Sequence, residues 1–167
     1  MAARTVYAAL FLAALILCAM LAAAQQQQPP SVWPMPKQFS TGSGSITLDA
    51  QNFVFTAPNV GVMNRAVQRY ASLIFPVKKR LAPLRLADGP ILSELRISVV
   101  DSKADLALGV DESYTVTVSP DKKWAQLDAQ TVWGALRGLE TFSQLVNFEQ
   151  SSRTYTVYGV PISIGDS

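Results

Sequence analysis

The stretch from Asp128 to Val146 constrains the fold of this chain more than any other segment. Its apolar residues recur at the spacing of one face of an α-helix. Thr131 stands just before them, where its hydroxyl can accept a hydrogen bond from a free amide of the first turn. The pattern therefore predicts an amphipathic helix that begins after Thr131 and buries Val132, Ala135, Leu136, Leu139, Phe142 and Val146.

Two glycines, Gly134 and Gly138, lie inside this predicted helix. Each costs a helix roughly 1 kcal/mol relative to alanine, so the close approach of another backbone is the expected reason for them. The helix is accordingly predicted to press against a sheet at the centre of the domain. An ordinary core helix is the favoured interpretation, and a chemical role for Arg137 or Glu140 is the alternative.

A second amphipathic segment follows Pro58. Asn59 is a candidate N-cap because its side chain can accept a hydrogen bond from the first turn. Pro76 marks the expected end, since proline cannot continue a helix. The face predicted to be buried carries Met63, Ala66, Val67, Tyr70 and Ile74.

The other segments show the alternation that is typical of β-strands. The glycine-rich residues Thr41–Ser45 are predicted to form a turn, and Ser119–Lys122 a hairpin loop. The order of elements predicts an α+β fold, a two-layer sandwich in which a mainly antiparallel sheet carries both helices on one face. The predicted strands are 46–48, 53–55, 95–100, 114–118, 124–128, and 153–158 and 160–164, the last two joined near Gly159.

Residues 1–24 have the parts of a secretory signal peptide: Arg4, an apolar middle and the small residues Ala22–Ala24. A membrane anchor is the alternative, because the apolar stretch is nearly long enough to span a bilayer. Alanine dominates the stretch and adds little hydrophobic drive, so cleavage after Ala24 is expected. The predicted destination is the secretory pathway, ending in the extracellular space, the cell wall or a vacuole, with no membrane association after cleavage.

Residues 25–31 are predicted to be a flexible leader, and residues 32–167 the folded domain.

Two short segments could contact a partner. Trp33 is expected to anchor the terminal segment to the core, and stacking on a ligand is the alternative. Lys78–Arg80 form a basic cluster, which is expected to be a solvated connection rather than a docking patch.

Several kinds of site are excluded by composition. Histidine is absent, and the one cysteine, Cys18, lies in the predicted signal peptide. A Ser-His-Asp or Cys-His catalytic site and an imidazole or thiolate metal site therefore cannot form in the domain. The net charge of +2 gives no indication of nucleic-acid binding. No cofactor and no metal is expected.

Asp111 and Glu112 are the one adjacent pair of carboxylates. In an extended segment their side chains would point to opposite faces, so a charged turn is predicted rather than a catalytic pair. The other carboxylates stand singly, without the spacing of an acid–base pair or a metal site. No catalytic residue is assigned, and this holds for Asp49, Asp88, Asp101, Asp105, Asp121, Asp128, Glu140, Glu149 and Asp166.

Four segments resemble the N-terminal, non-catalytic domain of eukaryotic, plant-like β-N-acetylhexosaminidases, which form glycoside hydrolase family twenty. The longest is Thr131–Leu145, with the sequence Thr-Val-Trp-Gly-Ala-Leu-Arg-Gly-Leu-Glu-Thr-Phe-Ser-Gln-Leu. The others are Val32–Pro36, which contains Trp-Pro-x-Pro, then Arg69-Tyr70, and Asp111–Thr115. The resemblance extends from Val32 to the last residue and implies the same α+β architecture.

The resemblance also implies that the chemistry resides in a separate catalytic barrel. Family members use a neighbouring Asp-Glu pair there: the Glu protonates the leaving oxygen, and the Asp orients the substrate's own acetamido group as nucleophile. Asp111-Glu112 lacks the glycine-rich strand end of that motif. Ile162–Asp166 resembles the strand that leads into the barrel, and a barrel needs about 250 further residues. A fragment, a truncated form or a free-standing relic is therefore expected.

The expected function is that of the structural N-terminal domain of a β-N-acetylhexosaminidase, an enzyme that removes terminal N-acetylhexosamine from glycans. The expected partner is the catalytic barrel, with glycans contacted only through it and a homodimer possible for the full-length enzyme. This chain alone is expected to be inactive. The alternative is a free-standing secreted module that binds or inhibits a protein or glycan.

Overall fold

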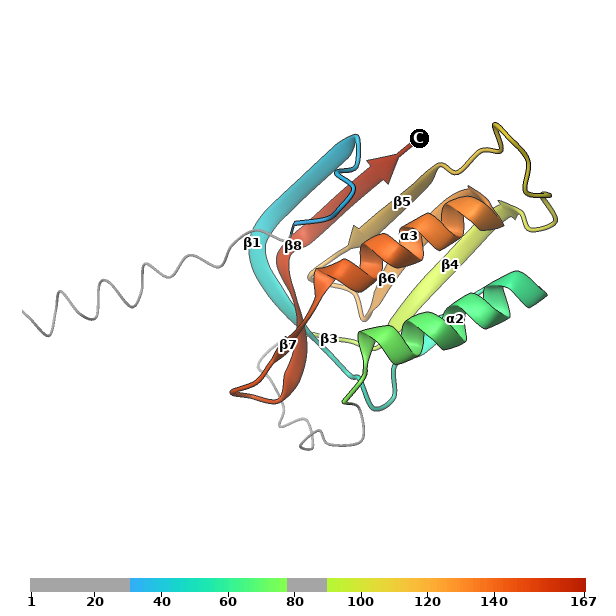
Figure 1. Cartoon of the computed structure of the whole chain (residues 1–167). Coiled ribbons are helices and arrows are strands. Elements are labelled where there is room, and N and C mark those ends of the chain that lie inside the picture. The colour runs from blue at the N-terminus through green and yellow to red at the C-terminus, as the bar shows by residue number, and fades with distance from the viewer. Residues whose placement is uncertain (1–30, 78–89) are drawn as a thin grey trace, which may run out of the picture.

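The structure is a computed structural model that describes residues 31–77 and 90–167 (Figure 1). The predicted signal peptide, nearly all of the predicted leader, the Lys78–Arg80 cluster and Asp88 lie outside the described residues. Along the chain the elements are β1 (Gln38–Leu48), β2 (Val54–Thr56), α2 (Gly61–Ile74), β3 (Ile91–Leu92), β4 (Glu94–Asp101), β5 (Tyr114–Val118), β6 (Trp124–Thr131), α3 (Val132–Leu145), β7 (Val146–Glu149) and β8 (Thr154–Asp166).

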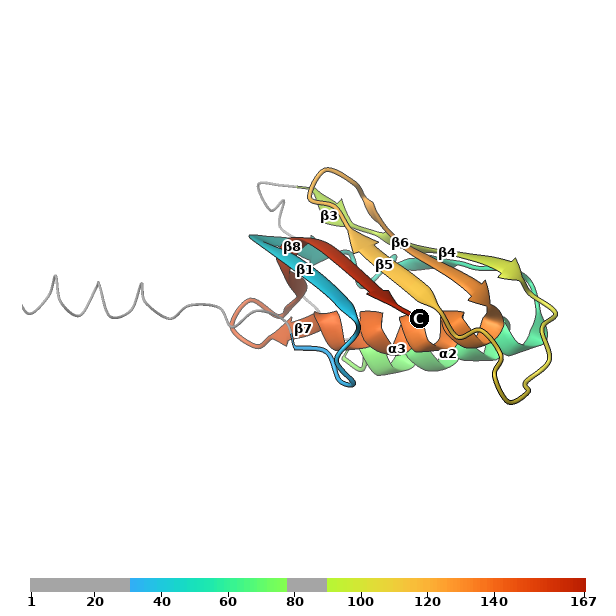
Figure 2. The same cartoon turned by 90° about the horizontal axis from the view of Figure 1, so that it is seen from above.

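The described elements form two layers, as predicted. One sheet has the strand order β2-β4-β6-β5-β8-β1-β3, with β7 paired to β8. Four of its pairings are antiparallel, and three are parallel: β1–β3, β2–β4 and β4–β6. Figure 2 shows α2 and α3 side by side beneath one face of the sheet, while the other face is not covered by a helix of the described residues. The α+β sandwich with both helices on one face is therefore confirmed.

Helix α3 begins as its sequence predicts. The Thr131 hydroxyl accepts hydrogen bonds from the amides of Trp133 and Gly134, at 3.2 and 3.3 Å. The same hydroxyl donates to the carbonyl of Asp111 at 2.6 Å, which ties the helix start to the loop before β5. The N-cap prediction is confirmed. Val146, however, begins β7 instead of continuing the helix.

The two glycines of α3 lie where the helix meets the sheet. A Cβ at Gly138 would come within 2.8 Å of the Leu127 side chain on β6. At Gly134 it would collide with the backbone carbonyl oxygen of Ser113. Because a side chain at either position would push the helix outward, the glycines allow the close packing that the sequence predicts.

Helix α2 buries Met63, Ala66, Tyr70 and Ile74, the face that its periodicity predicts, and it ends before Pro76. The proposed cap is wrong. The N-cap residue is Val60, which makes no side-chain capping bond, and the Asn59 side chain instead accepts a hydrogen bond from Asn64 at 2.9 Å. The helix is therefore held by burial of its apolar face rather than by a cap.

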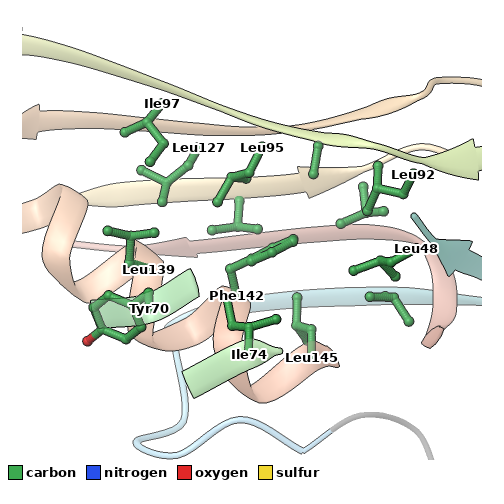
Figure 3. Packing of buried hydrophobic residues seen from close by; sticks show 14 of the residues in the cluster. Leu48, Tyr70, Ile74, Leu92, Leu95, Ile97, Leu127, Leu139, Phe142 and Leu145 are labelled. Atoms are coloured by element: carbon green, nitrogen blue, oxygen red, sulfur yellow. The ribbon is translucent and has the colours of Figure 1, made fainter. Parts of the chain in front are cut away.

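The core lies between the two layers. Leu139, Phe142 and Leu145 of α3 point toward the sheet residues Leu95 and Leu127 (Figure 3). Phe142 is fully buried and lies 6.3 Å from Phe53, measured between ring centroids. Tyr70 and Ile74 of α2 are also buried and pack against this core.

Two strand predictions are corrected by long-range pairing. Thr41–Ser45 is not a turn; it is part of β1, which runs along β8 with bulges on either side of Gly44. A Cβ at Gly42 would come within 2.6 Å of the Val160 carbonyl oxygen, so the glycines permit contact with β8. The two predicted final strands are one strand, β8, in which Gly159 takes a positive φ of 79°. A positive φ bends the strand without ending it.

Candidate functional site

Most carboxylates among the described residues are bound to nearby side chains or backbone amides. Glu94 accepts hydrogen bonds from Arg96 and Thr56, which lower the pKa of its carboxyl. Asp49 accepts from the Asn52 side chain at 3.0 Å. Other carboxylates bind nearby groups in the same way: Asp101 the Lys103 amide, Asp128 the Gln126 side chain, and Glu149 the Tyr158 hydroxyl.

Asp111 and Glu112 turn to different partners. Asp111 accepts a hydrogen bond from the Ser113 amide at 2.8 Å, and hydrogen bonding to Ser113 lowers the pKa of its carboxyl. Glu112 forms an ion pair with Arg137 of α3, with Nε 2.7 Å from Oε2. The two carboxylates are therefore bound to different groups, Asp111 to a backbone amide and Glu112 to a guanidinium. The interpretation of this pair as a charged turn agrees with this geometry.

Glu140 joins the two helices. Its carboxylate accepts a hydrogen bond from the Tyr70 hydroxyl at 2.7 Å, and the Arg69 guanidinium lies 5.0 Å from the centre of the Tyr70 ring. Burial raises the pKa of Tyr70, and the bond to Glu140 raises it further. Arg137 and Glu140, the two residues with a possible chemical role, are thus each bound to another side chain of the domain.

Replacing Glu112 by Ala is expected to change the free energy of unfolding by no more than about 0.5 kcal/mol. The ion pair with Arg137 is partly exposed, so solvent screens it and its loss is small. A urea titration of the variant beside the parent would measure this. A loss above about 2 kcal/mol would show that the pair holds the loop to α3.

The structure forms a groove of about 720 Å³ on the helix side of the molecule. We call it the α3 groove. Residues Ala107–Glu112 form one wall, Trp33 and Pro34 form another, and Arg137 and Glu140 of α3 lie between them. Asp166 and Ser167, at the end of β8, also line it.

The prediction that Trp33 anchors the terminal segment to the core is wrong, because its side chain is exposed. The buried residues of its segment are Val32 and Pro36, while 81% of the Trp33 surface is exposed. The Trp33 backbone is nevertheless held: its amide donates to the Gln144 side chain and its carbonyl accepts from the same side chain, both at 2.8 Å. Trp33 is therefore fixed by its main chain and leaves its indole free of the core.

A second groove, of about 470 Å³, lies across the end of the sheet. Ser98, Thr115 and Asp128 line it, with Lys37 at its rim. These side chains are polar and exposed. Two carboxylates, Asp128 and Asp166, are among the lining residues, and Asp128 is bound to the Gln126 side chain.

Two further features of the described part of the chain are its metal-ligand side chains and the length and polarity of its helices. Within residues 31–77 and 90–167, no three Asp, Glu, His or Cys side chains gather as metal ligands. The helices of that part are too short or too polar to cross a membrane.

The residues that shape the α3 groove are not evident from the sequence. Leu108 is fully exposed at the tip of the loop, and Gln144 resembles any other polar residue of a helix. Leu108-Gly109, with a positive φ of 81° at Gly109, carries a signal for a tight turn. Nothing in the local sequence indicates the contact between Gln144 and Trp33, which are 111 positions apart.

The chain is similar to curated proteins that are named as β-hexosaminidases. Beta-hexosaminidase 1 of Arabidopsis thaliana is 34% identical over 94% of this chain and 32% of its own length. Beta-hexosaminidase subunit beta of Felis catus is 37% identical over 76% of this chain and 25% of its own length. The chain therefore spans about a third or less of these curated relatives.

Solved structures show the same fold. A chitobiase of Flavobacterium johnsoniae superposes with a TM-score of 0.56 at 23% identity, covering 81% of this chain and 20% of that protein. An exo-β-N-acetylglucosaminidase of Vibrio harveyi superposes with a TM-score of 0.53 at 18% identity, covering 85% of this chain and 19% of that protein.

Residues 32–145, more than half of the chain, match the family described as "beta-acetyl hexosaminidase like". The chain therefore belongs to the β-hexosaminidase family that its Trp-Pro-x-Pro segment and its α3 helix resemble.

Proposed function

We propose that this chain is the non-catalytic domain of a β-N-acetylhexosaminidase and supports a catalytic barrel that supplies the chemistry. The observation that carries the proposal is the extent of the match. Nearly the whole chain corresponds to 32% of Arabidopsis beta-hexosaminidase 1, so most of that relative lies outside the matched part.

The chemistry of the reaction supports the same division. Glycoside hydrolysis requires two carboxyl groups with different pKa values beside one enclosed sugar. In the described residues, Glu112 is paired with Arg137, Glu140 is bound to Tyr70, and Asp111 binds a backbone amide. Each of these three carboxylates is thus bound to another group of the domain itself.

The purified chain is expected not to hydrolyse an aryl β-N-acetylglucosaminide. It lacks an enclosed acid–base pair among its described residues, so release of the aryl alcohol should equal the rate in buffer alone. A chimera in which this chain replaces the matched segment of Arabidopsis beta-hexosaminidase 1 should hydrolyse the same substrate.

Two outcomes would overturn the proposal. One is turnover by the isolated chain that Glu112→Gln abolishes, because the pair at Asp111-Glu112 would then be catalytic. The other is a chimera that folds but has no activity, because the chain could not then serve as the enzyme's accompanying domain. The unmodified Arabidopsis enzyme is the positive control.

We also propose that the chain enters the secretory pathway. Arg4, the apolar stretch and Ala22–Ala24 support a cleaved signal peptide. Expressed in a eukaryotic host, the protein is expected in the medium or a vacuolar fraction, with an N-terminus within a few residues of Gln25. N-terminal sequencing would test this, and an intact Met1 on a membrane-bound product would contradict it.

A further inference from the structure

We propose that the α3 groove is the surface on which this domain docks to the catalytic domain of its enzyme, with Trp33 and Leu108 as the two apolar anchors. The inference rests on the proposed function and adds to it the place and the chemistry of the contact.

Exposed apolar side chains gather at this groove. Trp33 and Leu108 both line it, and Leu106 projects from the same loop as Leu108. Large exposed apolar side chains that lie together mark interaction sites. Tryptophan is among the residues that most often dominate the energy of an interface. Here 81% of the Trp33 surface is exposed and Leu108 is fully exposed, so neither contributes to the core of the isolated domain.

The Trp33 backbone and both ends of the loop that carries Leu108 are held by hydrogen bonds to other elements. The Gln144 side chain binds the amide and the carbonyl of Trp33. On the other wall, the Trp133 indole donates to the Ala104 carbonyl at 2.9 Å, and the Thr131 hydroxyl donates to the Asp111 carbonyl. These bonds tie both ends of the loop that carries Leu108. A surface that is already ordered loses less conformational entropy on docking.

The centre of the groove is polar and charged. Arg137 uses its Nε for Glu112, and its guanidinium carries five N–H donors in all. Glu140 lies nearby and accepts from Tyr70. The partner surface that fits is therefore an apolar patch for Trp33 and Leu108 that flanks backbone or carboxylate oxygens directed at Arg137. A folded protein surface has this mixture.

The groove is also adjacent to the carboxyl end of the strand β8. Asp166 and Ser167 line it together with Trp33 and Leu108, so a domain joined to that end would stand beside these two side chains. Figure 1 shows this end of the chain at the end of β8. Covalent joining raises the effective concentration of the partner at the site to about the millimolar range. The open face of the sheet carries polar side chains such as Thr115, Thr117 and Gln126, and its exposed apolar residues on β2 and β4, Val54 and Val100, are smaller than Trp33 and Leu108.

The test uses the chimera of this chain with the remainder of Arabidopsis beta-hexosaminidase 1. Trp33→Ala, Leu108→Ala and the double variant are heated at one temperature, and the residual hydrolysis of an aryl β-N-acetylglucosaminide is followed with time. The double variant is expected to lose activity roughly tenfold faster than the parent chimera, as for loss of an interface hot spot. Val54→Ala, which removes a half-exposed side chain from the edge strand β2, is the matched control and should inactivate at the parent rate.

A second measurement separates docking from folding. The isolated 167-residue chain carrying both substitutions should melt within about 1 °C of the parent, because both side chains are exposed there. Equal inactivation rates for the double variant and the parent chimera would overturn the docking inference while leaving the proposed function intact. The docking inference would also be overturned if the isolated double variant melted at a temperature low enough to explain the faster loss of activity in the chimera. An inactive parent chimera would instead contradict the proposed function.

Discussion

Leu139→Ala is expected to lower the free energy of unfolding by about 2–5 kcal/mol. Leu139 has 0% of its surface exposed and points from α3 into the core beside Leu127 (Figure 3). Truncation removes the transfer free energy of three carbon atoms and leaves a cavity that rigid neighbours cannot fill. Because α3 packs on the sheet and on α2, the loss should appear as one cooperative shift of the urea midpoint with an unchanged slope.

Leu73→Ala is the matched control for this measurement. It makes the same chemical change on α2, but 59% of the Leu73 surface is exposed, so a change of no more than about 0.5 kcal/mol is expected. A midpoint for Leu139→Ala equal to that of the parent would show that the buried face of α3 is misassigned.

Gly134→Val is expected to lower the free energy of unfolding by roughly 3 kcal/mol. The first carbon added at Gly134 would collide with the backbone carbonyl oxygen of Ser113. Backbone cannot rotate away as a side chain can, so either α3 or the loop before β5 must shift. That shift would also disturb the Thr131 cap and the loop contact at Asp111, which lie at the same end of the helix.

Gly61→Val tests whether the loss comes from this collision. Gly61 begins α2, and a Cβ there would meet only the end of the Arg65 side chain, at 3.4 Å. A change within about 0.5 kcal/mol is therefore expected. Differential scanning calorimetry of both variants would decide the matter. Equal melting temperatures for Gly134→Val and the parent would mean that α3 and the loop are not in the close contact described.

The inactivity expected of the isolated chain agrees with the contacts that its carboxylates make. Glu112 is paired with Arg137, and Glu140 accepts a hydrogen bond from Tyr70. The α3 groove is the proposed docking surface of the domain. Function in this family is therefore expected to depend on how the domain is joined to its neighbour rather than on a reaction within it.

Sequence alone was sufficient for the features that depend on local periodicity and composition. The spacing of Val132, Leu139 and Phe142 determined the buried face of α3, and Thr131 determined its start. The order of periodic segments determined the two-layer architecture. The absence of histidine by itself excluded every catalytic or metal site that needs an imidazole, whatever the fold.

Tertiary structure alone decided the features whose partners are distant in the sequence. Thr41–Ser45 looks like a turn because it is rich in glycine, yet it pairs with β8 more than a hundred positions later, where those glycines allow close contact. Trp33 looks like a core anchor because it is large and aromatic, yet Val32 and Pro36 take the buried positions and Gln144 holds the Trp33 backbone. Local patterns indicate which side chains prefer burial, but the identity of the neighbour that covers a side chain depends on the packing of the whole chain. For that reason the α3 groove could be located only in three dimensions.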